Sequence, residues 1–366
     1  MTNTPAGQSG LIRNFAPGWF ASVMGTAVFV VDVFVFRNSL LPFANFLQLF
    51  FLGLATVMFV LILIPWILRW ILHFDAVCAD LNHPVSASFF PTMPISLIIL
   101  GIALEKAAPL FLSDAVLYPI LQTLWILGTL GIGIFSLVLL NIYFHRQNLD
   151  WKVGNLGWLI PPVSALIMPV LGNSLSLAYA GTLMGTINFI ASLIFLGIGG
   201  ILFLFVMTTV FSRYMFHELP PSHLAPTIWI GIAPTAILAI IAIKMTQPLA
   251  LFFIAPEAAV QTIGILAKAA GVSLWGFAFF WLLLAIIATL SQHRKARLSF
   301  AMSWWAFTFP FGAFVVSTGV VFQATQAAFF QWIGLASLAA FLVIWAMVAV
   351  HTVQGIISGE IFTPAH

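Results

Sequence analysis

Charged residues are scarce in this chain. Asp, Glu, Lys and Arg make up 6% of its 366 residues, whereas a soluble globular protein carries about 25%. So few charges cannot cover the surface of an ordinary soluble protein or form a basic face for nucleic-acid phosphates. Cys78 is the only cysteine. The composition therefore excludes a soluble enzyme, a nucleic-acid partner, an intrachain disulfide and a site built from several cysteines.

Recognisable cofactor motifs are also missing. Of the eight histidines, only His351 falls within an apolar run, so two helices cannot each supply a histidine to a haem iron. The chain has no H-E-x-x-H and no G-x-x-x-x-G-K-[ST] sequence. We therefore expect no metal, no cofactor and no catalytic residue, which disfavours a membrane-bound enzyme or redox subunit.

Apolar sequence is what the chain has in excess, with 62% hydrophobic residues and a mean hydropathy of +1.14. A membrane-spanning helix needs about 20 such residues. The sequence thus predicts an all-α integral membrane protein with ten transmembrane helices, forming a single membrane domain over residues 1–366. The predicted spans are approximately 16–37, 44–72, 89–105, 115–144, 157–179, 183–212, 224–247, 260–290, 300–322 and 326–354.

The few cations fix an orientation. With ten spans, eight of the twelve Lys and Arg residues fall on the side that carries both termini. Cytoplasmic loops of membrane proteins are enriched in these residues. We therefore predict a multi-pass protein of a plasma membrane (bacterial or archaeal inner membrane) with both termini in the cytoplasm. Those eight cations are Arg13, Arg69, Arg146, Lys152, Arg213, Arg294, Lys295 and Arg297.

Proline recurs in the odd-numbered spans, although a helix interior normally excludes it at about 3 kcal/mol. The even spans are almost free of it, with Pro65 as the clear interior exception. A recurrence about every 70 residues predicts five helical hairpins, each with a kinked and a continuous helix. Alternatively, these are ordinary kinks that packing tolerates. The repeating prolines are Pro17, Pro94, Pro162, Pro234 and Pro310.

Kinked helices belong inside a membrane protein, because the backbone groups that a kink frees cannot face lipid. Five kinked helices inside five continuous ones would enclose a central path. Small or hydroxylated residues near the kinks are candidates to line it, although each hydroxyl could instead bond to its own helix. These candidates are Ser22, Gly25, Thr26, Ser96, Ser164, Thr227, Thr235, Ser317 and Thr318. The kinks themselves, at Pro17, Gly25, Pro94, Pro162, Pro234 and Pro310, are also expected to line the pore.

Asp32 is the one acid well inside an apolar run. An intramembrane carboxylate is costly and indicates a functional site by default, so Asp32 is a possible proton-coupling acid. The alternative, which its place near Arg37 favours, is an interfacial residue that reaches water.

The kinked segments resemble the tellurite-resistance/dicarboxylate transporter (TDT) family, which includes bacterial TehA, the yeast malate permease and sulfite pump, and the plant slow anion channels. The similarity runs over about residues 13–355. It rests on the ordered set Phe15-Ala-Pro-Gly-Trp-Phe-Ala-Ser-Val-Met-Gly-Thr26, His83-Pro84, Phe90-Pro-Thr-Met-Pro94, Leu219-Pro-Pro221 with Pro226-Thr227 and Pro234, and Trp304-Trp-Ala-Phe-Thr-Phe-Pro310.

The resemblance implies a quasi-fivefold arrangement of five helical hairpins around a central pore, and a homotrimer with a separate pore in each protomer. It also implies a gating phenylalanine on the ninth helix. Phe309 matches that position in this sequence, and Phe307, two residues earlier, is the other candidate.

Two functions fit this architecture. One is a channel for small inorganic or organic anions. The other is a proton-coupled carrier for C4-dicarboxylates such as malate, or an exporter of sulfite or tellurite-related anions. Coupling needs titratable groups along the path, and Asp32 alone is available, so the residues favour the channel.

Overall fold

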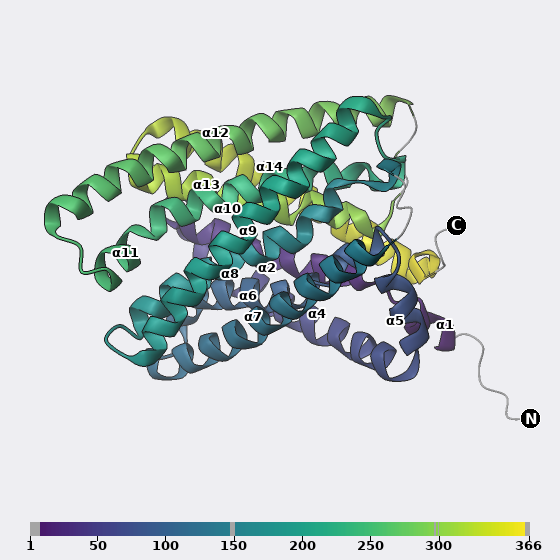
Figure 1. Ribbon diagram of the computed structural model, residues 1–366, viewed down its shortest axis with the longest axis horizontal. Coiled ribbons are helices and arrows are strands. Elements are labelled where there is room, and N and C mark those ends of the chain that lie inside the picture. Colours follow the sequence, from purple (N-terminus) through teal and green to yellow (C-terminus); the bar gives the residue numbers. More distant parts are fainter. Residues whose placement is uncertain (1–7, 147–150, 296–297, 299, 363–366) are drawn as a thin grey trace, which may run out of the picture.

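The computed structural model describes residues 8–146, 151–295, 298 and 300–362 (Figure 1). Every regular element in this part of the chain is a helix. The predicted Arg297 of the cationic side lies outside the described residues. The all-α class is thus confirmed.

Ten helices of the described part are long and apolar enough to cross a membrane. They agree with the ten predicted spans to within a few residues. The third is longer than predicted at both ends. A 3₁₀ segment, Ser86–Phe89, precedes its α-helix, and helical structure continues to Leu110 past the Glu105–Lys106 pair, whose charges are joined at 3.0 Å. The spans are Pro17–Val35, Ala44–Leu72, Ser86–Leu110, Asp114–His145, Leu156–Ala178, Leu183–Phe216, Ser222–Lys244, Glu257–Lys295, Met302–Thr325 and Ala328–Ser358.

The odd spans lie inside the bundle and the even spans outside. In an 18-residue apolar stretch of each span, 78% to 94% of the residues are buried in the odd spans, against 22% to 33% in the even spans. The predicted division into inner and outer helices is therefore confirmed. The outer helices are α4 (Ala44–Leu72), α7 (Asp114–His145), α9 (Leu183–Phe216), α12 (Glu257–Lys295) and α14 (Ala328–Ser358).

Each inner span is broken in the same way, as a 3₁₀ segment followed by an α-helix. The five pairs are η1 (Pro17–Trp19) with α2 (Phe20–Val35), η2 (Ser86–Phe89) with α6 (Thr92–Ala107), η5 (Leu156–Leu159) with α8 (Ile160–Ala178), η6 (Ser222–Gly231) with α10 (Ile232–Lys244), and η7 (Met302–Phe307) with α13 (Phe309–Thr325).

The repeating prolines stand at these junctions. Pro94, Pro162, Pro234 and Pro310 occupy the first turn of their α-helices, and Pro17 begins a 3₁₀ segment. A first-turn residue has no intrahelical acceptor for its N–H, so proline is tolerated there. The outer helices hold two interior prolines, Pro65 in α4 and Pro119 in α7. Pro119 is an interior proline of an even span that we did not expect from the sequence.

The inner helices close a ring, in which α2 packs on α6, α6 on α8, α8 on α10, α10 on α13, and α13 again on α2. Outer tryptophans tie this ring to the outer layer. The indole of Trp125 in α7 donates to the carbonyl of Met168 at 3.3 Å, that of Trp275 in α12 to Thr318 at 2.7 Å, and that of Trp345 in α14 to Thr26 at 3.0 Å. The quasi-fivefold symmetry itself stays a prediction.

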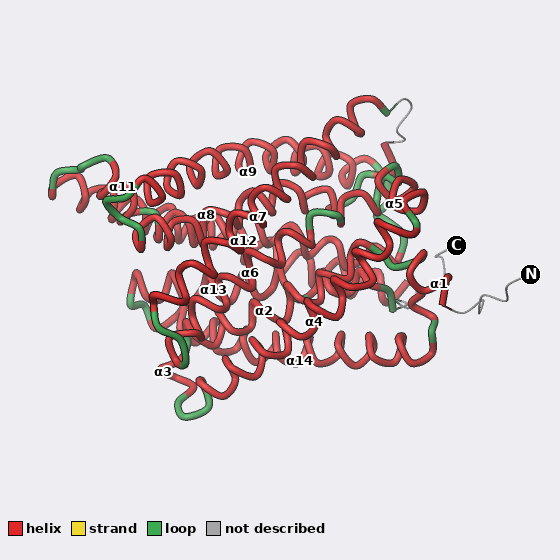
Figure 2. Tube along the Cα trace, turned by 90° about the horizontal axis from the view of Figure 1, so that it is seen from below, coloured by secondary structure: helices red, strands yellow, loops and turns green. Residues whose placement is uncertain are grey.

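The described chain ends lie at one end of the bundle, which we call the terminal end, together with α1 (Gln8–Arg13) and α5 (Phe74–Leu81) (Figures 1 and 2). The short helices α3 (Arg37–Leu40) and α11 (Thr246–Phe252) lie at the opposite end, the far end. At the terminal end Arg13 pairs with Asp75, and Arg69 pairs with Asp80 at 2.6 Å. The hydrogen bond from Arg13 holds the pKa of the Asp75 carboxyl below its usual value.

Candidate functional site: an apolar path through the inner ring

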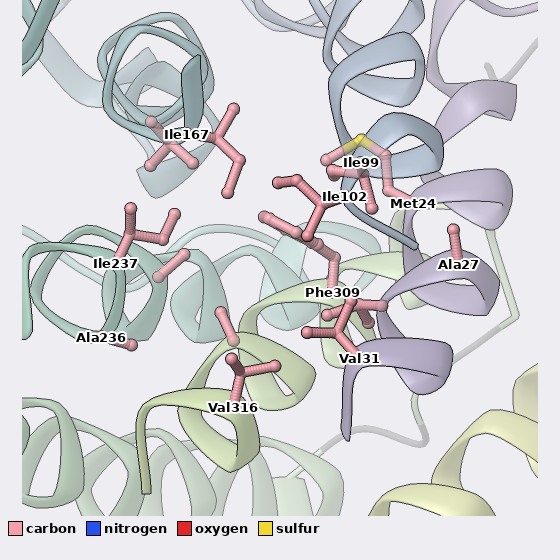
Figure 3. Close-up of a cluster of buried hydrophobic side chains, with 14 of the residues drawn as sticks. Met24, Ala27, Val31, Ile99, Ile102, Ile167, Ala236, Ile237, Phe309 and Val316 are labelled. Atoms are coloured by element: carbon pink, nitrogen blue, oxygen red, sulfur yellow. The ribbon is translucent and has the colours of Figure 1, made fainter. Parts of the chain in front are cut away.

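Two small cavities lie on the axis of the inner ring, each of about 40 Å³. The near cavity is on the side of the terminal end, and the far cavity is on the other side. Phe309 lines both cavities, so its side chain forms a wall between them. Figure 3 shows the phenyl ring of Phe309 in the middle of an apolar cluster, with side chains of α2, α6, α8 and α10 around it.

The lining residues form successive layers, each with one residue from every inner span. Along each span the layers follow one another at spacings of three, four, three and four residues. From the terminal end, the layers are Ala21, Thr92, Ile160, Ile230 and Ala306; Met24, Ile95, Val163, Ala233 and Phe309; Val28, Ile99, Ile167, Ile237 and Ala313; Val31, Ile102, Val170, Ile240 and Val316; and Val35, Lys106, Ser174, Lys244 and Val320.

Phe309 carries the one aromatic ring in its layer, and it is the first residue of α13. Phe307 has a different environment. Its ring meets that of Trp229 edge-on at 5.1 Å and that of Trp304 at 5.9 Å, and it lines neither cavity. Of the two candidate phenylalanines, Phe309 is thus the one on the axis, whereas Phe307 packs between neighbouring tryptophans.

Beyond the fourth layer the path widens into a cavity of about 210 Å³ at the far end, which we call the vestibule. The fourth layer lines both the far cavity and the vestibule, so the two are neighbours. The vestibule differs from the path in having polar walls. These polar residues are Glu105, Lys106, Asn173, Ser174, Lys244, Gln247 and Gln323.

The hydroxyl groups expected along the path bond instead to their own helices, as the alternative interpretation held. Ser22 donates to the carbonyl of Trp19 at 2.7 Å, Thr26 to that of Ser22 at 2.7 Å, and Ser317 to that of Phe314 at 2.8 Å. The remaining hydroxyls of that set do the same. Aliphatic side chains therefore line the path at these levels.

Gly25 and the prolines have diverse surroundings. A Cβ on Gly25 would lie 2.0 Å from the Thr308 hydroxyl, so this glycine permits close packing of α2 on the residue before Phe309. Pro310 lines the near cavity. Pro17 lines a cavity of about 890 Å³ at the terminal end, and Pro94 packs on Gly131 of α7. Pro162 and Pro234 stand in the first turns of α8 and α10.

Asp32 does not reach water, contrary to the interfacial position that we favoured from the sequence. The residue is fully buried, and neither carboxylate oxygen has a hydrogen-bond partner within the described structure. It faces α13, where a Cβ on Gly312 would lie 3.3 Å from its Oδ2. Arg37 does not pair with Asp32, because the Arg37 guanidinium lies over the ring of Phe34, 4.9 Å from its centre.

The described residues contain no group of three or more His, Cys, Asp or Glu side chains placed to hold a metal ion. The geometry is that of a narrow passage with an apolar middle, an aromatic wall and a polar far end. Such a passage suits permeation.

Comparison with known proteins agrees with this geometry. A sequence profile described as voltage-dependent anion channel (SLAC1) matches residues 14–353. The chain belongs to this family. The family expected from the kinked segments is thereby confirmed, and anion transport across a membrane is its general activity.

Relatives of this SLAC1-family chain match it over nearly its whole length. An uncharacterised transporter of Methanocaldococcus jannaschii is 32% identical over 354 residues, which cover 96% of each chain. A second transporter of that organism is 31% identical over 354 residues, covering 96% of this chain and 97% of the relative. A sulfite efflux pump of Arthroderma otae is 23% identical over 360 residues, covering 96% of this chain and 93% of the pump.

Most of the residues that line the path could not be identified from the sequence. The aliphatic layers have a signal, namely branched residues at alternating spacings of three and four, but core helices show the same pattern. Asn173 and Lys106 have no distinguishing motif, and only the folded helix ring brings them to the wall of one cavity.

Proposed function

We propose that this chain is a gated channel for small inorganic or organic anions, with its own pore closed by Phe309. The observation that carries the proposal is the shared wall: a single aromatic side chain separates two cavities on the axis of the inner ring. The family supports anion transport, and the layer around Phe309 has smaller or more flexible members that leave its ring as the largest obstruction.

An apolar passage of this width is closed to ions for a physical reason. Cavities of about 40 Å³ can hold a water molecule by size, but apolar walls leave such a cavity dry. A hydrated anion would have to shed its water to pass, without hydrogen bonds to replace it. Displacement of the Phe309 ring would join the two cavities, so that water could enter.

The helix termini favour anions at the same level. All five inner α-helices begin near the first two layers, at Phe20, Thr92, Ile160, Ile232 and Phe309. Each helix N-terminus carries a partial positive charge of roughly half an elementary charge. Five such ends around the near cavity lower the energy of an anion without a fixed cation that would trap it.

The test is Phe309→Ala, with Phe307→Ala as the matched control. Truncation of Phe309 removes the wall, so anion current across planar bilayers should rise about tenfold or more, because each ~1.4 kcal/mol taken from a barrier gives that factor. Phe307→Ala should leave the current at the wild-type level, since its ring lies between Trp229 and Trp304. A Phe309→Ala current equal to wild type, at equal protein density, would refute the gate.

The second candidate is a proton-coupled carrier for C4-dicarboxylates such as malate, or an exporter of sulfite or tellurite-related anions. Two observations favour it: a relative is a sulfite efflux pump, and Asp32 is buried without a partner in the described structure. A carboxyl group in such a place is a candidate to bind and release a proton during a transport cycle. The carrier would be favoured if sulfite uptake into liposomes followed a pH gradient while neither the wild type nor Phe309→Ala gave a current in planar bilayers.

We further propose a homotrimer in a bacterial or archaeal plasma membrane, with both termini in the cytoplasm and a pore in each protomer. The even spans, which form the outer helices, are the more exposed ones and carry many exposed apolar side chains. These side chains would face lipid or neighbouring protomers. The unequal distribution of Lys and Arg supports the orientation. Cross-linking of the protein in its native membrane would give a ladder that ends at three chains.

A further inference from the structure

We propose that Asn173 and Lys244 form a recognition site in the vestibule for a small oxyanion that carries one hydroxyl group. The proposal rests on the proposed anion transport and names a substrate class for it. The vestibule has room for such an ion, since its volume is about 210 Å³.

Asn173 is the central observation. Its side chain is 4% exposed, and both its amide nitrogen and its amide oxygen lack a hydrogen-bond partner in the described structure. A buried amide is normally paired, because an unpaired donor or acceptor costs free energy. Asn173 lines the vestibule three residues beyond Val170 of the fourth layer. Asn173 is therefore an unpaired donor and acceptor in the wall of this cavity.

The lysines supply charge of one sign. Lys106 is bound to Glu105 at 3.0 Å, and its ammonium also lies 5.5 Å from the centre of the Phe34 ring. Lys244, at the same level of the ring on α10, forms no ion pair within the described residues. The lysine of this cavity that is not held in an ion pair within the described residues is therefore Lys244, and it stands at the exposed mouth while Asn173 lies deeper.

The amide decides which anion fits. A halide can accept a hydrogen bond from the Asn173 N–H but has nothing to donate to its oxygen, so the acceptor would stay unpaired. An oxyanion with one hydroxyl accepts through an oxygen and donates through its O–H, which satisfies both amide atoms at once. A negative charge on the same ion faces Lys244. Hydrogensulfite and hydrogencarbonate have this chemistry, whereas chloride does not.

The experiment measures binding without permeation, so that it does not depend on the gate. Thermal unfolding of the purified protein in detergent is followed against rising hydrogensulfite, hydrogencarbonate and chloride, because a ligand that binds the folded state raises the unfolding temperature. We expect hydrogensulfite and hydrogencarbonate to raise it at concentrations at which chloride does not. Asn173→Leu and Lys244→Gln should each weaken hydrogensulfite binding by about tenfold or more, since hydrogen bonds to charged groups are among the stronger ones.

Lys268→Gln is the matched control, because Lys268 is an exposed cation of α12 that does not line the vestibule. It should leave the affinity unchanged. An unchanged affinity in Asn173→Leu, with the protein folded, would overturn the site and mean that water alone satisfies this amide. Equal affinities for chloride and hydrogensulfite would overturn the assigned ligand class. Binding that follows the proposal in a protein that transports no anion would refute the proposed function and leave the site standing.

Discussion

At the scale of single residues, Asp32 separates the two candidate functions. Its carboxyl group faces Gly312 at the contact of α2 with α13, and it lines neither cavity on the axis. For a channel, replacing it by Asn keeps the shape and removes a group whose ionised form is costly at this depth. We therefore expect Asp32→Asn to change the current of the open Phe309→Ala protein by less than about twofold, which corresponds to only ~0.4 kcal/mol in a barrier.

The same substitution has the opposite expectation in a coupled carrier. There it would abolish the response of sulfite uptake to a pH gradient while the protein remained folded. Current in planar bilayers and uptake in liposomes, measured on one preparation of each variant, distinguish the two outcomes. Loss of the pH response would move the assignment to the carrier.

At the scale of elements, the 3₁₀-to-α junctions explain how the inner helices tolerate proline. Pro234 is in the first turn of α10, where its missing N–H leaves no hydrogen bond broken. Ala239 lies in the middle of the same helix and is fully buried. Pro234→Ala should lower the free energy of unfolding by less than about 1 kcal/mol, mainly through greater freedom of the unfolded chain.

Ala239→Pro is the reverse exchange within one helix. It removes an intrahelical hydrogen bond and brings the ring against the preceding turn, so it should cost about 3 kcal/mol or more. Thermal unfolding of both variants in the same detergent measures the difference. Equal losses would show that the position of proline within α10 has no bearing on stability.

At the scale of the whole molecule, the single cysteine reports the orientation. Cys78 is half-buried in α5, at the terminal end of the bundle. With that end in the cytoplasm, a membrane-impermeant maleimide should label Cys78 in opened cells and leave it unlabelled in intact ones. Cys78→Ser with Glu257→Cys, which moves the thiol to the start of α12 at the far end, should be labelled in intact cells as well as in opened ones. Labelling of Cys78 in intact cells would mean that the terminal end lies outside the cell, opposite to the proposed orientation.

The span boundaries and the inner and outer sets could be predicted from the sequence, because hydropathy and proline report the bilayer and the backbone directly. The path could not. Its lining depends on how each helix is rotated about its axis, and the prolines do not record this. Pro162 stands two residues beyond its member of the first layer, Ile160, whereas Pro310 stands four beyond Ala306.

Burial of polar groups was equally hidden. Asp32 looked interfacial because Arg37 follows five residues later, yet the helix carries its side chain toward α13 and Arg37 toward Phe34. Asn173 sits among apolar and small residues of α8, and its isolation follows from the neighbours that the helix ring brings around it. Such facts belong to tertiary packing, and local sequence does not encode them.

The layered lining means that any of the five inner helices could supply the side chain that blocks the path. Because each layer draws one side chain from every helix at a common height, the obstruction is a property of the layer rather than of α13. Ala233 of α10 occupies the same layer as Phe309, so an aromatic side chain at this position would block the path from the α10 side. Evolution could therefore relocate the plug from one repeat to another, and a related protein without a phenylalanine at this position of its ninth span need not be an open hole.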